Sequence, residues 1–184
     1  MKRVLSIIIL ILAFASLGKA QGLPSVAGVT FGSRYSACKT ILDKRFNGGK
    51  DSYQTSPNKL TYNDVSFAGE QFDYVDFEFQ VEGNATYLYY ISFYSRFDLN
   101  SAEYAKRQRD RLYTVFSEKY DFRWSGTDED GFKYYIFGHS PNNREDGFIN
   151  NIGTSKSETK GGKMKYWTIL SYGPVNFVNP SDEI

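Results

Sequence analysis

Two runs of alternating aromatic residues constrain this chain more than any other feature of its sequence. They cover residues 72–81 and 87–97. In both runs, aromatic and aliphatic residues recur with a period of two, which is typical of a β-strand with two unlike faces. Between the runs, Glu82, Gly83 and Asn84 predict a hairpin turn. The chain is therefore expected to build its core on antiparallel β-sheet.

The same alternation divides the side chains into two sets. One set is expected to face the core: Val75, Phe77, Phe79, Ile91 and Phe93. The other set is expected on the opposite side of the sheet: Phe72, Tyr74, Asp76, Tyr90, Tyr94 and Arg96. Aromatic anchors with arginine nearby are typical of protein interfaces, so this second set is our candidate partner-binding face. Aromatic side chains of this kind can also bind sugar rings. The alternative to a binding site is that this side of the sheet is covered by loops or a second chain for structural reasons alone.

Residues 1–20 have the pattern of a secretory signal peptide. Lys2 and Arg3 precede an apolar stretch over residues 4–17, and Gly18 and Ala20 place small residues at a cleavage site. The apolar stretch is shorter than the roughly 18 to 20 residues that span a bilayer, which favours a signal peptide over an anchor. Gln21 follows, where a lipoprotein would need cysteine. We expect cleavage after Ala20 and a secreted or periplasmic protein.

Residues 21–184 are expected to form a single domain. Cys38 is the only cysteine, so no disulfide within the chain can stabilise it. Removing the signal peptide leaves 19 basic against 21 acidic residues, a net charge of −2. That balance argues against a nucleic-acid partner. No transmembrane segment is expected after cleavage, and we attribute the glycosylation sequon at residues 84–86 to chance.

The remaining pattern predicts two helices and four more strands. A first helix is expected after a Ser33 cap, with Tyr35, Cys38, Ile41, Leu42 and Phe46 on its apolar stripe. A second helix is expected over residues 101–120, opened by a capping box of Asn100 and Glu103. Strands are expected at 60–67, 132–139, 147–155 and 166–172, a polar loop at 50–59, and an extended or disordered tail at 173–184.

This order predicts an α+β fold, an antiparallel β-sheet with two helices packed on one face, and suggests a tandem αβββ repeat. The second helix carries a charged cluster on its expected outer face: Lys106, Arg107, Arg109, Asp110 and Arg111. Such a cluster is either a solvated helix face or a partner site.

The stretch Gly28, Val29, Thr30, Phe31, Gly32, Ser33, followed by an amphipathic helix, resembles the opening of many small secreted proteins of Bacteroidetes-type bacteria. The helix-then-meander order resembles the β-lactamase-inhibitor-protein-like group, which includes outer-membrane assembly lipoproteins. These resemblances imply an exported binding or assembly protein with an open sheet face. The lipoprotein cysteine of the assembly group is absent.

The sequence offers few candidate catalytic residues. His139 is the only histidine, and no nucleophile elbow surrounds any serine. Asp76 and Glu78 share one side of a strand and lie close enough for a glycosidase pair. The acidic residues 128–130 indicate a turn rather than a calcium loop. No cofactor or metal is expected.

We therefore expect an exported, non-enzymatic binding protein of the bacterial cell envelope, with a protein or peptide partner favoured over a glycan. The alternative is a small envelope hydrolase using the paired carboxylates or His139.

Overall fold

The structure is a computed structural model that describes residues 23–46, 52–56, 58–141, 146–159 and 161–175. The predicted signal peptide lies outside these residues. The described elements are β1 (Ser25–Val26), β2 (Val29–Thr30), α2 (Tyr35–Arg45), β3 (Ser52–Ser56), β4 (Lys59–Phe67), β5 (Glu70–Glu82), β6 (Ala85–Phe97), a 3-10 turn η1 (Leu99–Ser101), α3 (Ala102–Ser117), β7 (Phe122–Thr127), β8 (Lys133–Phe137), β9 (Ile149–Glu158) and β10 (Met164–Tyr172).

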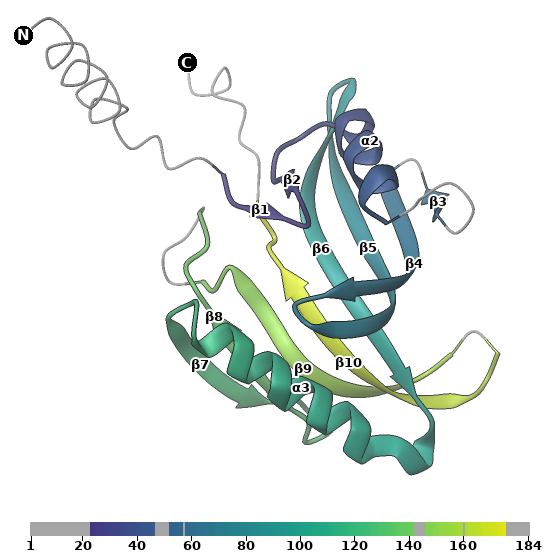
Figure 1. The fold of residues 1–184 in the computed structure, drawn as a ribbon, viewed down its shortest axis with the longest axis vertical. Coiled ribbons are helices and arrows are strands. Elements are labelled where there is room, and N and C mark those ends of the chain that lie inside the picture. The colour runs from purple at the N-terminus through teal and green to yellow at the C-terminus, as the bar shows by residue number, and fades with distance from the viewer. Residues whose placement is uncertain (1–22, 47–51, 57, 142–145, 160, 176–184) are drawn as a thin grey trace, which may run out of the picture.

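One antiparallel sheet of eight strands organises the molecule, in the order β3-β4-β5-β6-β10-β9-β8-β7 (Figure 1). Strands β3 to β6 follow α2, strands β7 to β10 follow α3, and the two groups meet where β6 pairs with β10. The predicted α+β class with an antiparallel sheet is confirmed. The suggested αβββ repeat needs correction, because each helix is followed by four strands.

The short strands β1 and β2, which form a separate two-stranded sheet, were not predicted, and the two unpredicted strands of the eight-stranded sheet are its two edges. We expected β3 to lie inside a polar loop and assigned no strand to β7. Residues of β7 are mostly exposed, so their sequence lacks the alternation of a half-buried strand.

Both helices pack on the same face of the sheet (Figure 1). Helix α2 buries Cys38 and Leu42, and its Tyr35 ring lies 5.0 Å from that of Phe79. Helix α3 buries Leu112 and Phe116. Since the apolar stripes of both helices meet the sheet, its opposite face is left without a helix among the described residues. We call that opposite side the open face.

Details of both helices differ from the sequence-based expectation. Ile41 is 43% exposed, so the apolar stripe of α2 is narrower than predicted. Arg109, expected on the outer face of α3, is only 9% exposed and lies 5.8 Å from the ring of Tyr135. Helix α2 is preceded by Arg34 rather than by a Ser33 cap. Neither helix start has a side-chain cap hydrogen bond.

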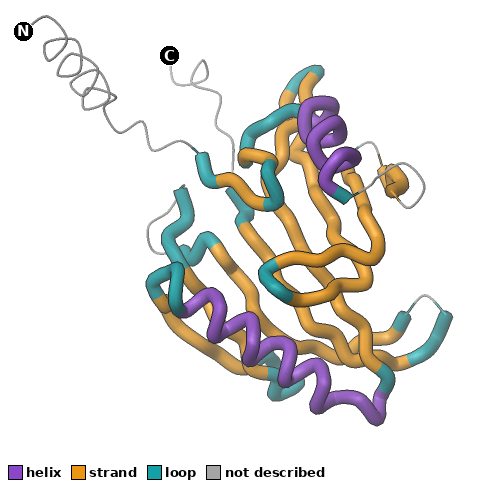
Figure 2. Tube along the Cα trace, viewed as in Figure 1, coloured by secondary structure: helices purple, strands orange, loops and turns teal. Residues whose placement is uncertain are grey.

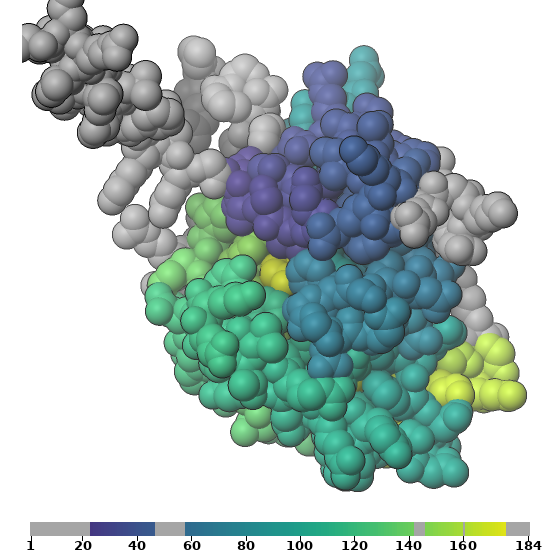
Figure 3. Space-filling view, in the orientation of Figure 1, coloured from purple at the N-terminus to yellow at the C-terminus, as the bar shows by residue number. Residues whose placement is uncertain are grey.

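The tip of the β4–β5 hairpin folds across the helix-covered face, between α2 and α3 (Figures 1 and 2). Asp64 has a φ of 52°, a left-handed conformation that bends β4 away from the plane of the sheet. Beyond the bend, Phe67 stacks on Phe93 at 4.4 Å. Gln108 of α3 donates a 2.8 Å hydrogen bond to the carbonyl of Gln71. The hairpin tip thus fills the space between the helices, as the blue surface in the space-filling view shows (Figure 3).

Because of this bend, the predicted position of Phe72 is wrong. We expected its side chain on the open face, but it is 2% exposed and lies 5.2 Å from the ring of Phe93 in the core. The hairpin carries Phe72 onto the helix side, so the period of two does not extend to the start of β5.

A β-bulge in β6 also breaks the simple alternation. Glu78 pairs with Tyr90 and Phe79 with Leu88, which leaves Tyr89 as the extra residue. Leu88 is buried in the core, whereas alternation alone had placed it opposite the core set. At the far end of β5, Val81 is 53% exposed. The sheet core therefore ends at Phe79.

The chain after β10 stays packed for three residues. The amide of Gly173 donates to the carbonyl of Phe148, and that of Val175 to the carbonyl of Tyr89. Val175 is buried, so residues 173–175 are packed against the domain, whereas the prediction placed them in an extended or disordered tail. Residues 176–184 lie outside the described residues. Neither described helix has the length and apolar character needed to cross a bilayer.

Candidate functional site

Three aromatic side chains form a cluster at the centre of the open face. Tyr74 and Tyr94 face each other across β5 and β6, with ring centroids 4.7 Å apart and ring planes 19° apart. Trp167 of β10 stands edge-on to both, at 6.3 Å from each. All three are half-buried. Their mutual contacts hold them in place, while part of each ring remains accessible to solvent.

The cluster belongs to a row that crosses the sheet at right angles to the strands. From β8 to β5, residues paired in register follow one another: Tyr134, Gly153, Ile169, Tyr94 and Tyr74. At the β7 end, a Cβ on Gly126 would lie 2.6 Å from the Tyr134 hydroxyl. The Tyr134 side chain therefore occupies the space above Gly126, and the aromatic row reaches the edge of the sheet.

A row of short polar residues runs beside the aromatic row. Four of them pair in sequence across β10, β6, β5 and β4: Ser171, Ser92, Asp76 and Thr61. The hydroxyls of Ser92 and Ser171 are 2.8 Å apart, and Thr61 donates a 2.7 Å hydrogen bond to Asp76. All four are buried although no described helix covers them. Short side chains between taller aromatic ones lose contact with water, so this row forms the floor of the open face.

Lys59 joins two carboxylates at one end of the polar row. Its Nζ lies 2.7 Å from Asp76 and 3.3 Å from Glu78, and the Tyr89 hydroxyl donates to Glu78 at 3.3 Å. Burial opposes the charge of the ammonium, but hydrogen bonds and attraction from Asp76, and then from Glu78, raise the pKa of Lys59. Burial, followed by the charge of Glu78, raises the pKa of Tyr89. This group is an ion-paired cluster that is internally satisfied.

Of the six residues predicted for the site, four present accessible side chains on the open face: Tyr74, Tyr90, Tyr94 and Arg96. Arg96 is exposed and lies 3.5 Å from Asp73. Asp76 lies in the floor, where its side chain is turned to Thr61 and Lys59. Phe72 is in the core, as described above. The open face also includes aromatic residues that the prediction missed: Tyr89, Tyr134 and Trp167.

Trp167 could have been found from the sequence. Residues 166–172 were assigned to a strand, and alternation places 167, 169 and 171 together. Periodicity does not reveal the pairing of β6 with β10, which joins residues 69 to 81 positions apart. That pairing brings Trp167 beside Tyr94.

The candidate catalytic groups do not converge. Asp76 and Glu78 share Lys59, and His139 follows β8, which is separated from β5 by three strands. At about 4.8 Å per strand, that separation is on the order of 19 Å. Cys38 is buried in α2, and burial raises the pKa of its thiol to about 12. Within the described residues, no three His, Cys, Asp or Glu side chains gather as a metal site.

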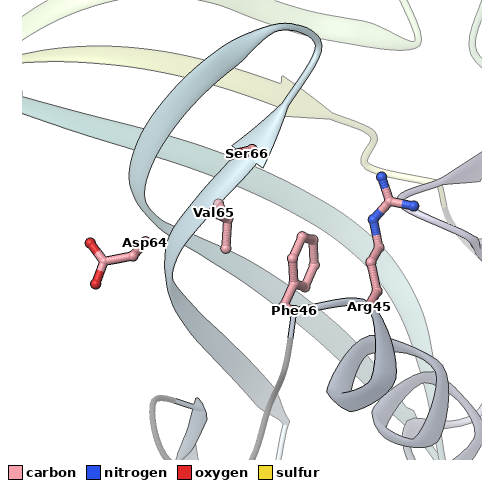
Figure 4. Close-up of a pocket in the computed structure, with 5 residues that line it drawn as sticks. All are labelled: Arg45, Phe46, Asp64, Val65 and Ser66. Carbon is pink, nitrogen blue, oxygen red and sulfur yellow. The ribbon is translucent and has the colours of Figure 1, made fainter.

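A surface hollow of about 460 Å³ lies on the helix side, beside the bend of β4 (Figure 4). It is lined by Arg45, Phe46, Asp64, Val65 and Ser66. The carboxylate of Asp64 points away from Arg45, so the charged groups do not converge on one point (Figure 4). This arrangement lacks the convergent polar groups that small-molecule sites use.

The charged cluster of α3 is largely self-neutralised. Lys106 pairs with Glu103, Arg109 with Asp110, and Arg111 with Glu70 at the hairpin tip. These contacts favour the interpretation of a solvated helix face. They also explain why Arg111 is directed toward the hairpin.

Comparison of the chain with protein-family models, with curated proteins and with solved structures finds no match to any of them.

Proposed function

We propose that this chain is an exported binding protein of the bacterial cell envelope that takes a protein or peptide partner on its open face. The observation that carries the proposal is the cluster of Tyr74, Tyr94 and Trp167 above a buried polar floor. Tyrosine and tryptophan are enriched among residues that dominate binding energy at protein interfaces. An ordered cluster loses little conformational freedom when it binds.

The geometry of the rings favours a protein or peptide over a sugar. Stacking at 4.7 Å turns the faces of Tyr74 and Tyr94 toward each other. A sugar ring stacks on a free aromatic face, whereas these tyrosines offer their edges and hydroxyls. Burial, opposed in part by Ser92, raises the pKa of Tyr94. Its hydroxyl therefore stays protonated near neutral pH and can donate to a backbone carbonyl of the partner.

The test is selection of peptides from a random dodecamer library displayed on phage, with the purified chain immobilised. Selected peptides are then titrated against the chain by calorimetry. We expect the Tyr74→Ser, Tyr94→Ser double variant to weaken binding at least about tenfold, because each lost anchor costs about 1 kcal/mol or more. Chemical-shift mapping should place the bound peptide on β5, β6 and β10.

The matched control is Tyr104→Ser, which removes an exposed tyrosine from α3 on the other side of the molecule. It should leave peptide binding unchanged. Selected peptides that bind the double variant as tightly as the parent chain would refute the proposal. So would binding to a glycan array with no peptide selected, since that outcome assigns the face to sugars.

Export rests on the signal-peptide pattern of residues 1–20 and has its own test. The chain is expressed in a Gram-negative host, and the periplasmic fraction is analysed by intact mass spectrometry. The expected mass corresponds to a chain that begins at Gln21. An uncleaved chain in the cytoplasmic fraction would contradict export and leave the binding face to be tested separately.

A further inference from the structure

Among the described residues, strand β7 is an unpaired edge of the eight-stranded sheet. It pairs with β8 on one side and is the last strand in the order (Figure 1). Phe122 and Trp124 are 49% and 48% exposed on it. Proteins usually protect such edges with proline, inward-pointing charge or a covering segment. The sequence of β7 contains no proline and one charged residue, Arg123.

The register of β7 with β8 tells which backbone groups point to the open edge. The amide of Asp128 donates to the carbonyl of Phe132, and the same register pairs Gly126 with Tyr134. In antiparallel sheet, hydrogen-bonded and non-hydrogen-bonded pairs alternate. Residues 124, 126 and 128 therefore bond to β8, while Ser125 and Thr127 direct their N–H and C=O groups outward.

We propose that β7 pairs antiparallel with β7 of a second copy of this chain, around a two-fold axis at Gly126. In this register, Ser125 of each copy lies opposite Thr127 of the other, so all their outward backbone groups find partners. Gly126 meets Gly126 at the axis, where neither residue has a side chain of its own to obstruct the approach of the two strands. The result is one continuous sheet of sixteen strands with an isologous interface.

Charge complementarity favours a second copy of this chain as the partner of β7, and it favours the register centred on Gly126. Arg123 lies at one end of β7, and the exposed acidic turn of Asp128, Glu129 and Asp130 follows the other end. Antiparallel pairing brings Arg123 of each copy to the acidic turn of the other, twice in each dimer. A shift of two residues, with Ser125 on the axis, instead sets Asp121 opposite Glu129. The repulsion disfavours that register.

The experiment is sedimentation velocity of the purified chain over a concentration series at low salt. The parent chain should form dimers as concentration rises. Ser125→Pro removes an outward N–H without touching the ladder to β8, and should raise the dimer dissociation constant at least about tenfold. The matched control Ser125→Ala keeps the N–H and should dimerise like the parent.

Charge variants decide the matter even if the proline variant fails to fold. Arg123→Glu alone and Glu129→Arg alone should each weaken the dimer, because each sets like charges opposite each other at both ends. An equimolar mixture of the two variants should form a heterodimer, since two acidic side chains on one copy then meet two basic side chains on the other. A parent chain that stays monomeric to about 1 mM, or a mixture that remains monomeric, overturns the proposal. So does a dimer unaffected by every variant, because it uses another surface.

Discussion

The Tyr62 hydroxyl donates a 2.7 Å hydrogen bond to Oδ1 of Asp43 and thereby joins strand β4 to helix α2. Tyr62 is almost completely buried, and Lys39 of the same helix pairs with the other oxygen of Asp43. Burial alone would raise the pKa of Asp43, but the hydrogen bonds from Lys39 and Tyr62 outweigh it and lower that pKa. The ionised carboxylate therefore helps to hold α2 against the sheet.

Asp43→Asn should destabilise the chain in a pH-dependent way. A carboxyl whose pKa is lowered on folding contributes stability above its ordinary value of 3.8, and that contribution disappears as pH falls through the lowered value. We expect a loss of about 1 kcal/mol at pH 7, measured by urea unfolding, that is constant to pH 5 and narrows below about pH 4. Asp64→Asn, which changes an exposed carboxylate at the bend, is the control. If the difference in unfolding free energy between the parent chain and Asp43→Asn grew as the pH fell, the role given to Asp43 would be contradicted.

Removal of Lys59 should lower the unfolding free energy, because its two carboxylate partners then lie close together without a cation. In Lys59→Met, Asp76 remains buried beside Glu78 without a cation, and the unfolding free energy should fall by about 2–3 kcal/mol. The second change Asp76→Asn should restore part of the loss, because it removes the uncompensated charge. The pKa of Lys59 is raised, so its stabilisation is fully present below 10.5 and is lost only above that pH. If Lys59→Met and the double variant were equally stable, the loss in Lys59→Met would not come from the uncompensated charge of Asp76.

Phe72 and Tyr74 occupy the same side of β5 by alternation but opposite sides of the sheet in space. Phe72→Ala should cost about 3–5 kcal/mol of unfolding free energy, because it empties a site in the core. Tyr74→Ala should cost about 1 kcal/mol, since it removes one cross-strand ring contact. Urea unfolding of both variants measures the difference. Similar losses for the two would contradict the bend at Asp64.

Local pattern predicted the elements that have one buried and one wet face. Strand β6, helix α3 and the turn at Gly83 follow from periodicity and turn chemistry, because an element that buries one side carries apolar residues at a regular spacing. The bend at Asp64 does not follow, because the hairpin tip packs between α2 and α3 through contacts with residues far away in the sequence, such as that of Gln71 with Gln108. Strand β7 does not follow either, because an edge strand with exposed residues loses its alternation.

The candidate site was predicted in part for the same reason. Tyr74 and Tyr94 come from neighbouring strands joined by a short turn, so alternation alone places them together. Trp167 joins them only through the pairing of β6 with β10, a contact between the two halves of the chain. Tyr89 joins the face through a bulge, which no periodic pattern predicts.

Cys38 should behave as an inert core residue. It is fully buried in α2, its Sγ lies 3.8 Å from the carbonyl of Ser33, and burial raises the pKa of its thiol to about 12. Because the thiolate is the reactive form, Ellman's reagent at pH 8 should not modify the folded chain. Full reaction of one thiol should appear in denaturant, which provides the positive control. Cys38→Ser should lower the unfolding free energy, since it buries a hydroxyl in an apolar site. Rapid modification of the native chain would show that α2 opens or that Cys38 is reactive.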